Sequence, residues 1–258
     1  MKHRLLAIFA HADDETLLAG PVLAKYAETT DVTIVCVAPG DENRKERLMR
    51  ASRILGVSQV ETLDYQGSPM WVDQPLHPED FLCLSNSPLD HLVDDLASLI
   101  KKYQPQVILT HSSYGDYGHP DHVAVHQATV SAVHSLNRLE IKVYGLAWSP
   151  RLISLYLKAL SLMGRDIYHA GPDKTMNLKA LVDSAPAKTC LIDVHKHLGK
   201  RREGASIYES EIAAGPWPLR LLERSPIWIQ RFFLGKASFT LLNSKSSASL
   251  ERDLFAGL

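Results

Sequence analysis

The stretch that decides the fold is Leu5-Leu-Ala-Ile-Phe-Ala10, which is followed at once by His11-Ala-Asp-Asp-Glu15. Six apolar residues without a polar interruption are typical of a strand buried on both faces, as in a parallel sheet. The five residues after the strand hold one imidazole and three carboxylates. Ligands bind beyond the carboxyl ends of the strands in open α/β sheets, so we expect the chemistry of this protein in such loops.

Strands and helices alternate through the rest of the first 150 residues. Further strands are predicted at 31–38, 60–65, 107–110 and 143–148, and helices at 16–26, 42–55, 89–103 and 119–136. This alternation predicts an α/β protein with a Rossmann-like, mostly parallel sheet flanked by helices.

The last hundred residues are less regular. A helix is predicted at 151–163, a strand at 188–194 and a polar helix at 195–210. We expect a single domain over residues 1–258, in which a core (1–150) carries a C-terminal elaboration (151–258) that shapes the pocket. The irregular stretch 66–88 is interpreted as a long covering loop.

The composition excludes several classes of protein. Twenty-eight Lys and Arg against 29 Asp and Glu give a formal net charge of −1, which leaves no positive excess for nucleic acid. The three cysteines are scattered, which argues against a disulfide scaffold. No apolar run approaches the roughly 18 residues of a membrane span, and the N-terminal run is too short for a signal peptide. We expect a cytoplasmic protein with no integral membrane segment.

A second polar cluster, Tyr117-Gly-His-Pro-Asp-His122, follows the strand predicted at 107–110. Four of the chain's 12 histidines lie between His111 and His126. Two imidazoles and a carboxylate without thiolate suit a divalent metal, above all Zn²⁺ in an open catalytic site, although other divalent ions are possible. Such a metal lowers the pKa of a bound water toward about 7, and the remaining carboxylates and imidazoles can transfer protons during amide hydrolysis.

These residues resemble the LmbE-like (PIG-L) N-acetylglucosaminyl deacetylases. The first signature of that family, AHPDDE, corresponds to Ala10–Glu15, and the second, HPDH, corresponds to His119–His122. Both motifs occur in the family's order, each after the expected strand. The resemblance implies an LmbE-like fold and removal of the N-acetyl group from an N-acetylglucosamine-type sugar or glycoconjugate, which releases acetate and a free amine.

The resemblance also implies how the first motif and the metal work together. His11, Asp14 and His122 correspond to the three zinc ligands. Asp13 corresponds to the general base that activates the zinc-bound water.

The remaining site residues follow from the same resemblance. His119 corresponds to the general acid and oxyanion partner, and Asp121 to the residue that orients it. Tyr117 matches a position that moves toward the reaction centre in related enzymes, and Arg44 matches a sugar-binding arginine. The sequence departs from the family pattern at Ala12, where proline is usual, and at Arg47, where glutamate is usual.

The residues alone leave other functions open. One is an amidase that acts on a different amide, such as a thiol conjugate. Another is a mononuclear Fe(II) oxygenase, which also uses two histidines and a carboxylate. A third is a non-catalytic sugar-binding domain. Among the other histidines, His126 is interpreted as structural or surface-exposed, and for His111 a structural role is weighed ahead of a ligand role.

The segment from Trp217 to Phe239 combines aromatic and basic residues: Trp217, Trp228, Phe232, Phe233 and Phe239 among Arg220, Arg224, Arg231 and Lys236. A membrane-surface helix, a subunit interface and packing on the core all fit this composition. Pro218 and Pro226 limit any long amphipathic helix, so we favour packing on the core or at an interface. We expect a homo-oligomer.

Overall fold

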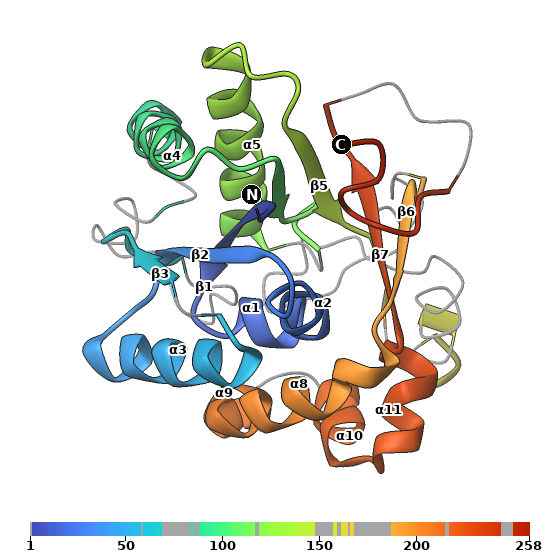
Figure 1. Ribbon diagram of the computed structural model, residues 1–258. Coiled ribbons are helices and arrows are strands. Elements are labelled where there is room, and N and C mark those ends of the chain that lie inside the picture. Colours follow the sequence, from blue (N-terminus) through green and yellow to red (C-terminus); the bar gives the residue numbers. More distant parts are fainter. Residues whose placement is uncertain are drawn as a thin grey trace.

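A seven-stranded sheet with the order β3-β2-β1-β4-β5-β7-β6 forms the centre of the molecule (Figure 1). The computed structural model describes residues 2–57, 59–68, 84, 88–116, 119–147, 157–158, 161–164, 166–167, 187–214, 217–243 and 250–258. The strands are β1 (Arg4–His11), β2 (Asp31–Ala38), β3 (Gln59–Thr62), β4 (Val107–Thr110), β5 (Lys142–Leu146), β6 (Cys190–Asp193) and β7 (Lys236–Leu241). The first five run parallel, and β7 runs antiparallel to both of its neighbours. The predicted Rossmann-like, mostly parallel sheet is confirmed.

Helices cover both faces of the sheet because β1 is apolar on both sides. The side chains of Leu6 and Ile8 pack in one cluster with residues of α4 (Leu89–Tyr103) and α5 (Pro120–Ser135). The side chains of Leu5 and Phe9 pack in a second cluster with residues of α2 (Gly20–Tyr26). Alternate residues of a strand point to opposite faces, so the unbroken apolar run stabilises both layers at once.

The helix predicted at 16–26 is two helices, α1 (Asp14–Leu17) and α2. Pro21 lies in the first turn of α2, where its missing N–H costs nothing, whereas the interior of a continuous helix would lose a hydrogen bond there. By contrast, α3 (Glu42–Leu55) has the predicted bounds, and Gly56 ends it in the left-handed conformation, at φ 87°.

The C-terminal region adds helices and the two antiparallel strands to the same sheet. The polar helix predicted at 195–210 is a series of short elements: η3 (His195–His197), α8 (Leu198–Ala205), η4 (Ser206–Tyr208) and α9 (Glu209–Ala214). Two further helices follow, α10 (Trp217–Arg224) and α11 (Ile227–Leu234). Most of the helix predicted at 151–163 and of the loop 66–88 lies outside the described residues. No helix among the described residues is long and apolar enough to cross a membrane.

Candidate metal centre and active site

The two polar motifs meet where the strand order changes direction. From β1 the chain continues outward to β2 and β3, and it then returns to place β4 on the other side of β1. His11 is the last residue of β1, Asp14 is the first of α1, and His119 is the N-cap of α5. In doubly wound sheets, this reversal opens a crevice at the carboxyl ends of the strands, and ligands bind there.

The Asp14 carboxylate lies at the centre of three imidazole rings. Its Oδ2 atom is 3.4 Å from His122 Nε2, 3.6 Å from His11 Nδ1 and 3.6 Å from His111 Nε2. The same oxygen accepts a hydrogen bond of 2.9 Å from the backbone N–H of His11. Two sets of side chains here could hold a metal ion, namely His11, His119 and His122, and Asp14, His111 and His122.

Both ring nitrogens of His111 have partners within the protein. Its Nε2 atom accepts a hydrogen bond of 2.8 Å from the backbone N–H of Ala10, so its proton lies on Nδ1, which donates to Asp116 at 2.5 Å. Burial lowers the pKa of this ring and keeps it neutral. With both nitrogens engaged, His111 holds the end of β1 against the loop after β4.

Asp116 orients His122, and sequence reasoning missed it. Its Oδ2 atom accepts a hydrogen bond of 2.9 Å from His122 Nδ1, and its Oδ1 atom accepts one of 2.9 Å from the backbone N–H of Ser112. Burial alone would raise the pKa of this carboxyl, but the contacts with His111 and His122 hold it well below its usual value. The arrangement directs His122 Nε2 toward Asp14. A carboxylate that holds the second nitrogen of a ligand histidine is common at metal sites.

Asp13 has a strained backbone and a buried carboxyl group. Its φ is 140°, a region that L-residues rarely occupy. The backbone N–H of Asp13 donates to Glu15 Oε2 at 2.9 Å, and Glu15 Oε1 in turn accepts from the hydroxyls of Thr16 at 2.6 Å and Tyr208 at 2.9 Å. Burial, reinforced by the charge of Asp14, raises the pKa of Asp13 to about 8. A carboxyl that titrates near neutrality is suited to accept a proton.

His119 is oriented by a backbone contact. The backbone N–H of Asp121 donates to His119 Nδ1 at 3.2 Å, so the neutral ring carries its proton on Nε2. Burial, followed by the charge of His11, lowers the pKa of His119 to about 3. The ring of His119 stacks on that of His122, with 4.8 Å between their centroids. His119 therefore lies beside the imidazoles that surround Asp14.

The Asp121 carboxylate lies against His11. Its Oδ2 atom is 2.9 Å from His11 Nε2 and accepts a hydrogen bond of 2.7 Å from the backbone N–H of Ser68. Burial lowers the pKa of His11, but the contacts with Asp121 and Asp14 raise it to about 9. The side chain of Asp121 thus fixes the ring of His11, while its backbone contacts His119.

Arg44 reaches the loop of the first motif from α3. Its Nη2 atom donates to the carbonyl oxygen of Ala12 at 2.9 Å and lies 3.8 Å from Asp13 Oδ2. Arg47, which replaces the glutamate of the family pattern, pairs with Glu211 of α9 at 2.8 Å. The carboxylate of Glu211, from the C-terminal region, therefore lies next to position 47, where the family pattern has a glutamate. Tyr117 lies outside the described residues.

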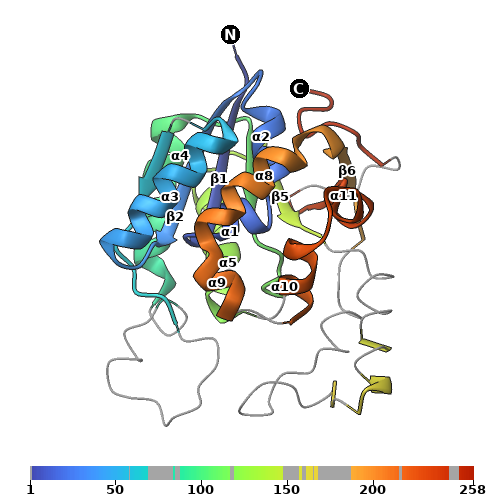
Figure 2. The same ribbon diagram turned by 90° about the horizontal axis from the view of Figure 1, so that it is seen from below.

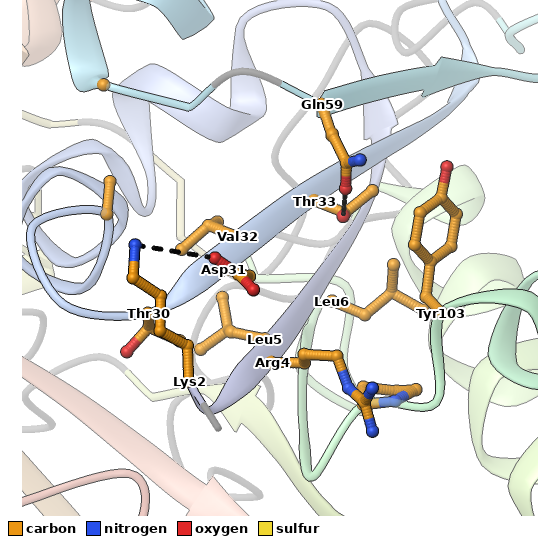
Figure 3. A pocket seen from close by; sticks show the side chains of 13 residues that line it. Lys2, Arg4, Leu5, Leu6, Thr30, Asp31, Val32, Thr33, Gln59 and Tyr103 are labelled. Carbon is orange, nitrogen blue, oxygen red and sulfur yellow. Dashed lines mark hydrogen bonds and ion pairs between the residues drawn. The ribbon is translucent and has the colours of Figure 1, made fainter.

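A hollow of about 370 Å³ lies at the opposite edge of the sheet, by the amino ends of β1 and β2 (Figure 3). Its lining contains no imidazole, and the one carboxylate in it, Asp31, pairs with Lys2 at 3.8 Å. Thr33 donates to Gln59 on its wall. Among the described residues, the hollow offers no group that could hold a metal or transfer a proton at neutral pH.

Comparison with known proteins places this site in a family of enzymes. The family model described as "GlcNAc-PI de-N-acetylase" (PIG-L) matches residues 6–133, which include both motifs. A 1D-myo-inositol 2-acetamido-2-deoxy-alpha-D-glucopyranoside deacetylase from Thermobifida fusca is 27% identical over 81% of this chain and 84% of its own length. A mycothiol S-conjugate amidase from Streptomyces coelicolor is 31% identical over 57% of this chain and 58% of its own.

The solved structures agree on the fold. The N,N'-diacetylchitobiose deacetylase from Pyrococcus horikoshii superposes with a TM-score of 0.55 at 15% identity, over 93% of this chain and 84% of its own. At 15% identity, this structural similarity supports the fold alone. The kind of enzyme is indicated by the motifs and by the sequence relatives. Residues 6–133 of the chain thus match the PIG-L (LmbE-like) family of de-N-acetylases, and the relatives are named as enzymes that hydrolyse an amide C–N bond.

Proposed function

We propose that the protein is a zinc-dependent deacetylase that removes the N-acetyl group from an N-acetylglucosamine-type sugar or glycoconjugate and releases acetate and a free amine. One observation carries this proposal: His11 and His122 turn a ring nitrogen toward the same carboxylate oxygen of Asp14, at 3.6 and 3.4 Å. The family model and the names of the relatives support this substrate class.

The distances around Asp14 fit a metal site. A tetrahedral zinc ion with bonds of about 2.0–2.1 Å separates its ligand atoms by roughly 3.4 Å. The separations of Asp14 Oδ2 from His122 Nε2 (3.4 Å) and from His11 Nδ1 (3.6 Å) match that edge length and are long for a hydrogen bond. His111 is equally near, but its Nε2 atom already accepts the Ala10 N–H. We therefore propose His11, Asp14 and His122, the set that the family motifs imply, as the ligands, whereas the geometry groups His122 with His11 and His119 and with Asp14 and His111.

Nitrogen and oxygen donors without thiolate favour zinc, although other divalent ions also accept them. When bound, the metal lowers the pKa of a water molecule and polarises the amide carbonyl. The residues of the chain supply the remaining steps. Asp13, with its pKa near 8, accepts the proton of the attacking water. His119 donates a hydrogen bond from Nε2 to the oxygen that becomes negative, and Asp13 passes the proton it has accepted to the leaving amine.

Four residues hold this machinery in place without reacting. Asp116 fixes the ring of His122, and the carboxylate of Asp121 fixes that of His11. Glu15 accepts the backbone N–H of Asp13 and so stabilises its unusual φ. The peptide N–H of Asp121 sets the orientation of His119. Arg44, tied to Ala12 at the rim, is assigned to the sugar side of the substrate.

An amidase that cleaves a different amide is the second candidate, because the relative from Streptomyces coelicolor carries that name. The same metal, base and acid would serve both reactions. An Fe(II) oxygenase is less compatible, since Asp13 and His119 add proton-transfer groups that such oxygenases do not need. A non-catalytic sugar-binding domain would have no use for a buried carboxyl with a pKa near neutrality.

The test is an assay of amine release from a panel of N-acetylated sugars and conjugates. The chain is freed of metal with a chelator and reloaded with Zn²⁺ or, without oxygen, with Fe²⁺. We expect release from N-acetylglucosamine-type substrates to return with Zn²⁺, and Asp13→Asn to keep the metal and lose turnover. Cleavage of thiol-conjugate amides alone would favour the amidase. Oxygen uptake with Fe²⁺, or sugar binding without turnover, would overturn the proposal.

A further inference from the structure

The hairpin formed by α10 and α11 has its polar groups inside. Gln230 is fully buried, and its Nε2 atom contacts the carbonyl oxygens of Leu222 at 3.1 Å, Glu223 at 3.1 Å and Ser225 at 3.3 Å. The Glu223 carboxylate turns inward to Arg201 of α8, with two contacts of 2.7 and 2.5 Å. Gln230 therefore joins the two helices of the hairpin to each other, and the Glu223–Arg201 pair joins the hairpin to α8.

Four large apolar side chains of the hairpin are exposed. The exposed fractions are 63% for Leu221, 68% for Trp228, 78% for Phe232 and 43% for Phe233. The side chains of Trp228, Phe232 and Phe233 therefore do not pack on the core of the chain, which leaves the interface of the two expected arrangements. The core side of the hairpin is already occupied by Gln230 and the Glu223–Arg201 pair, whereas Phe239 of β7 is buried as expected. Side chains of this size pack inside most proteins or cover a contact surface.

Positive charge surrounds these apolar side chains. Arg220, Arg224, Arg231 and Lys236 are all exposed. The stretch from residue 217 to residue 236 contains one acidic residue, Glu223, and its carboxylate is engaged by Arg201. These exposed side chains together form a surface that we call the hairpin face. It consists of Leu221, Trp228, Phe232 and Phe233 with Arg220, Arg224, Arg231 and Lys236. This face is apolar and cationic, although the whole chain has a net charge of −1.

We propose that the hairpin face docks on an anionic lipid bilayer. Aromatic and aliphatic side chains enter the boundary between headgroups and acyl chains, while arginines at the same level contact lipid phosphates. Each helix has eight residues, about 12 Å of length, so neither can span the bilayer and both lie along its surface. The proposal concerns a contact surface and is independent of the reaction assigned above.

The charge of the face decides between a bilayer and a second copy of the chain. In a twofold dimer the same patch meets itself, so the arginines of one copy would face those of the other. The hairpin face has no available carboxylate to pair with them, because Glu223 is turned inward. An anionic bilayer supplies both the negative charge and the apolar layer.

Helix α8 lies between the hairpin and the metal centre and contacts both regions. Helix α8 contacts α11 through the hairpin's inner side and also contacts α1, whose first residue is Asp14. Figure 2 shows α8 between α1 and α11. A bilayer bound at the hairpin face therefore lies two helices away from the metal centre, and no residue of the face belongs to the catalytic machinery.

The test is co-sedimentation of the full chain with vesicles of phosphatidylcholine alone or mixed with phosphatidylserine. We expect binding to the anionic vesicles only. The variant Trp228→Ala/Phe232→Ala should abolish it, and Arg224→Gln/Arg231→Gln should weaken it roughly 30-fold, since each arginine near such a surface contributes about fivefold. Leu139→Ala and Arg53→Gln, exposed residues elsewhere, serve as matched controls and should bind normally.

Each variant is checked for its melting temperature and for deacetylation of a substrate free in solution, both of which should stay unchanged. Equal sedimentation with both kinds of vesicle, or none with either, would overturn the proposal. So would hairpin variants that bind as well as the controls. A concentration-dependent dimer that the hairpin variants dissociate, without any vesicle binding, would instead identify a second copy as the occupant.

Discussion

The two edges of the sheet differ in what they offer to a ligand. At the carboxyl edge, carboxylates and imidazoles are packed together with almost no exposed surface, and the Asp14 and His122 side chains touch in the interior. At the amino edge there is a hollow of about 370 Å³, lined by polar and aliphatic side chains that include the exposed pair of Lys2 and Asp31. Among the described residues, the polar cluster and this hollow thus lie at opposite ends of the same strands.

The hollow at the amino edge is therefore a poor guide to the site, because its lining holds none of the clustered imidazoles and carboxylates. Strand β1 begins at Arg4 beside the hollow and ends at His11 in the cluster, so a single strand connects the two edges. The reversal of strand order between β1 and β4 opens a crevice at the carboxyl edge, where helix N-termini add their partial positive charge. Substitutions at the two edges should therefore differ sharply in their effect on turnover.

The largest effect is expected for His122→Ala at the carboxyl edge. Removal of a ligand nitrogen leaves Asp14 and His11 to hold the ion alone, so both metal content and turnover should fall to background. Metal analysis of the purified variant and an amine-release assay measure the two quantities. Full metal content together with normal turnover in this variant would remove His122 from the ligand set.

Asp13→Asn should reduce kcat about 10²–10⁴-fold, as is usual when a general base is lost. The amide keeps the shape of the side chain, so metal content and the melting temperature should remain close to those of the original chain. Steady-state kinetics with a saturating sugar substrate, next to metal analysis, make this measurement. Wild-type kcat in Asp13→Asn would show that another group accepts the proton.

Asp116→Asn should weaken metal binding about 10–100-fold, because the carboxylate that fixes the ring of His122 is replaced by a neutral amide. Competition with a chromophoric chelator gives the affinity. Turnover at saturating metal should recover most of its value, which separates a positioning residue from a ligand. An unchanged affinity would mean that His122 holds its orientation without Asp116.

A smaller effect is expected for Tyr208→Phe, which removes the hydroxyl that donates to Glu15 Oε1 at 2.9 Å. The loss of a buried hydrogen bond to a carboxyl should lower the free energy of unfolding by about 1–3 kcal/mol. Turnover should fall only modestly, because Thr16 and the N–H of Asp13 still hold Glu15. Chemical denaturation and the amine-release assay record both. If this variant also lost metal, Tyr208 of η4 would have to be counted among the residues that hold the metal site in place.

The smallest effect is expected at the amino edge. Asp31→Asn breaks the exposed pair with Lys2, which should change the free energy of unfolding by less than about 1 kcal/mol and leave turnover as it is. This variant is the counterpart of Asp13→Asn at the other end of the strands. A loss of turnover in Asp31→Asn would contradict the view that the hollow has no part in the reaction.

The core of the fold could be predicted because its signals are local. Each of these signals acts within a few residues, as do the apolar runs of β1, β2 and β4 and the cap glycine Gly56. The residue pattern alone was therefore enough to predict these strands and the end of α3. The motifs likewise indicated the family and the enzyme class. The ligand set and the base remain predictions, and they rest on the distances around Asp14.

The supporting contacts could not be predicted because they join distant parts of the chain. Tyr208 and Glu15 are 193 positions apart, and Arg47 is 164 positions from Glu211. Asp116 is near His122 in sequence, but its role depends on a left-handed backbone, at φ 62°, that no pattern indicated. In the hairpin, the composition favoured core or interface packing of the aromatic residues, and the inward position of Gln230 and Glu223 leaves Trp228, Phe232 and Phe233 exposed.

The position of β7 constrains the order in which the chain can fold. Strand β7 lies between β5 and β6 although it follows both in sequence, and β6 pairs along its length with β7. During synthesis, β5 therefore remains an open edge, and β6 has no neighbour in the sheet until residues 236–241 have left the ribosome. Chains that stop before residue 236 would expose two unpaired strands, so truncation there should yield an aggregating product rather than a smaller enzyme.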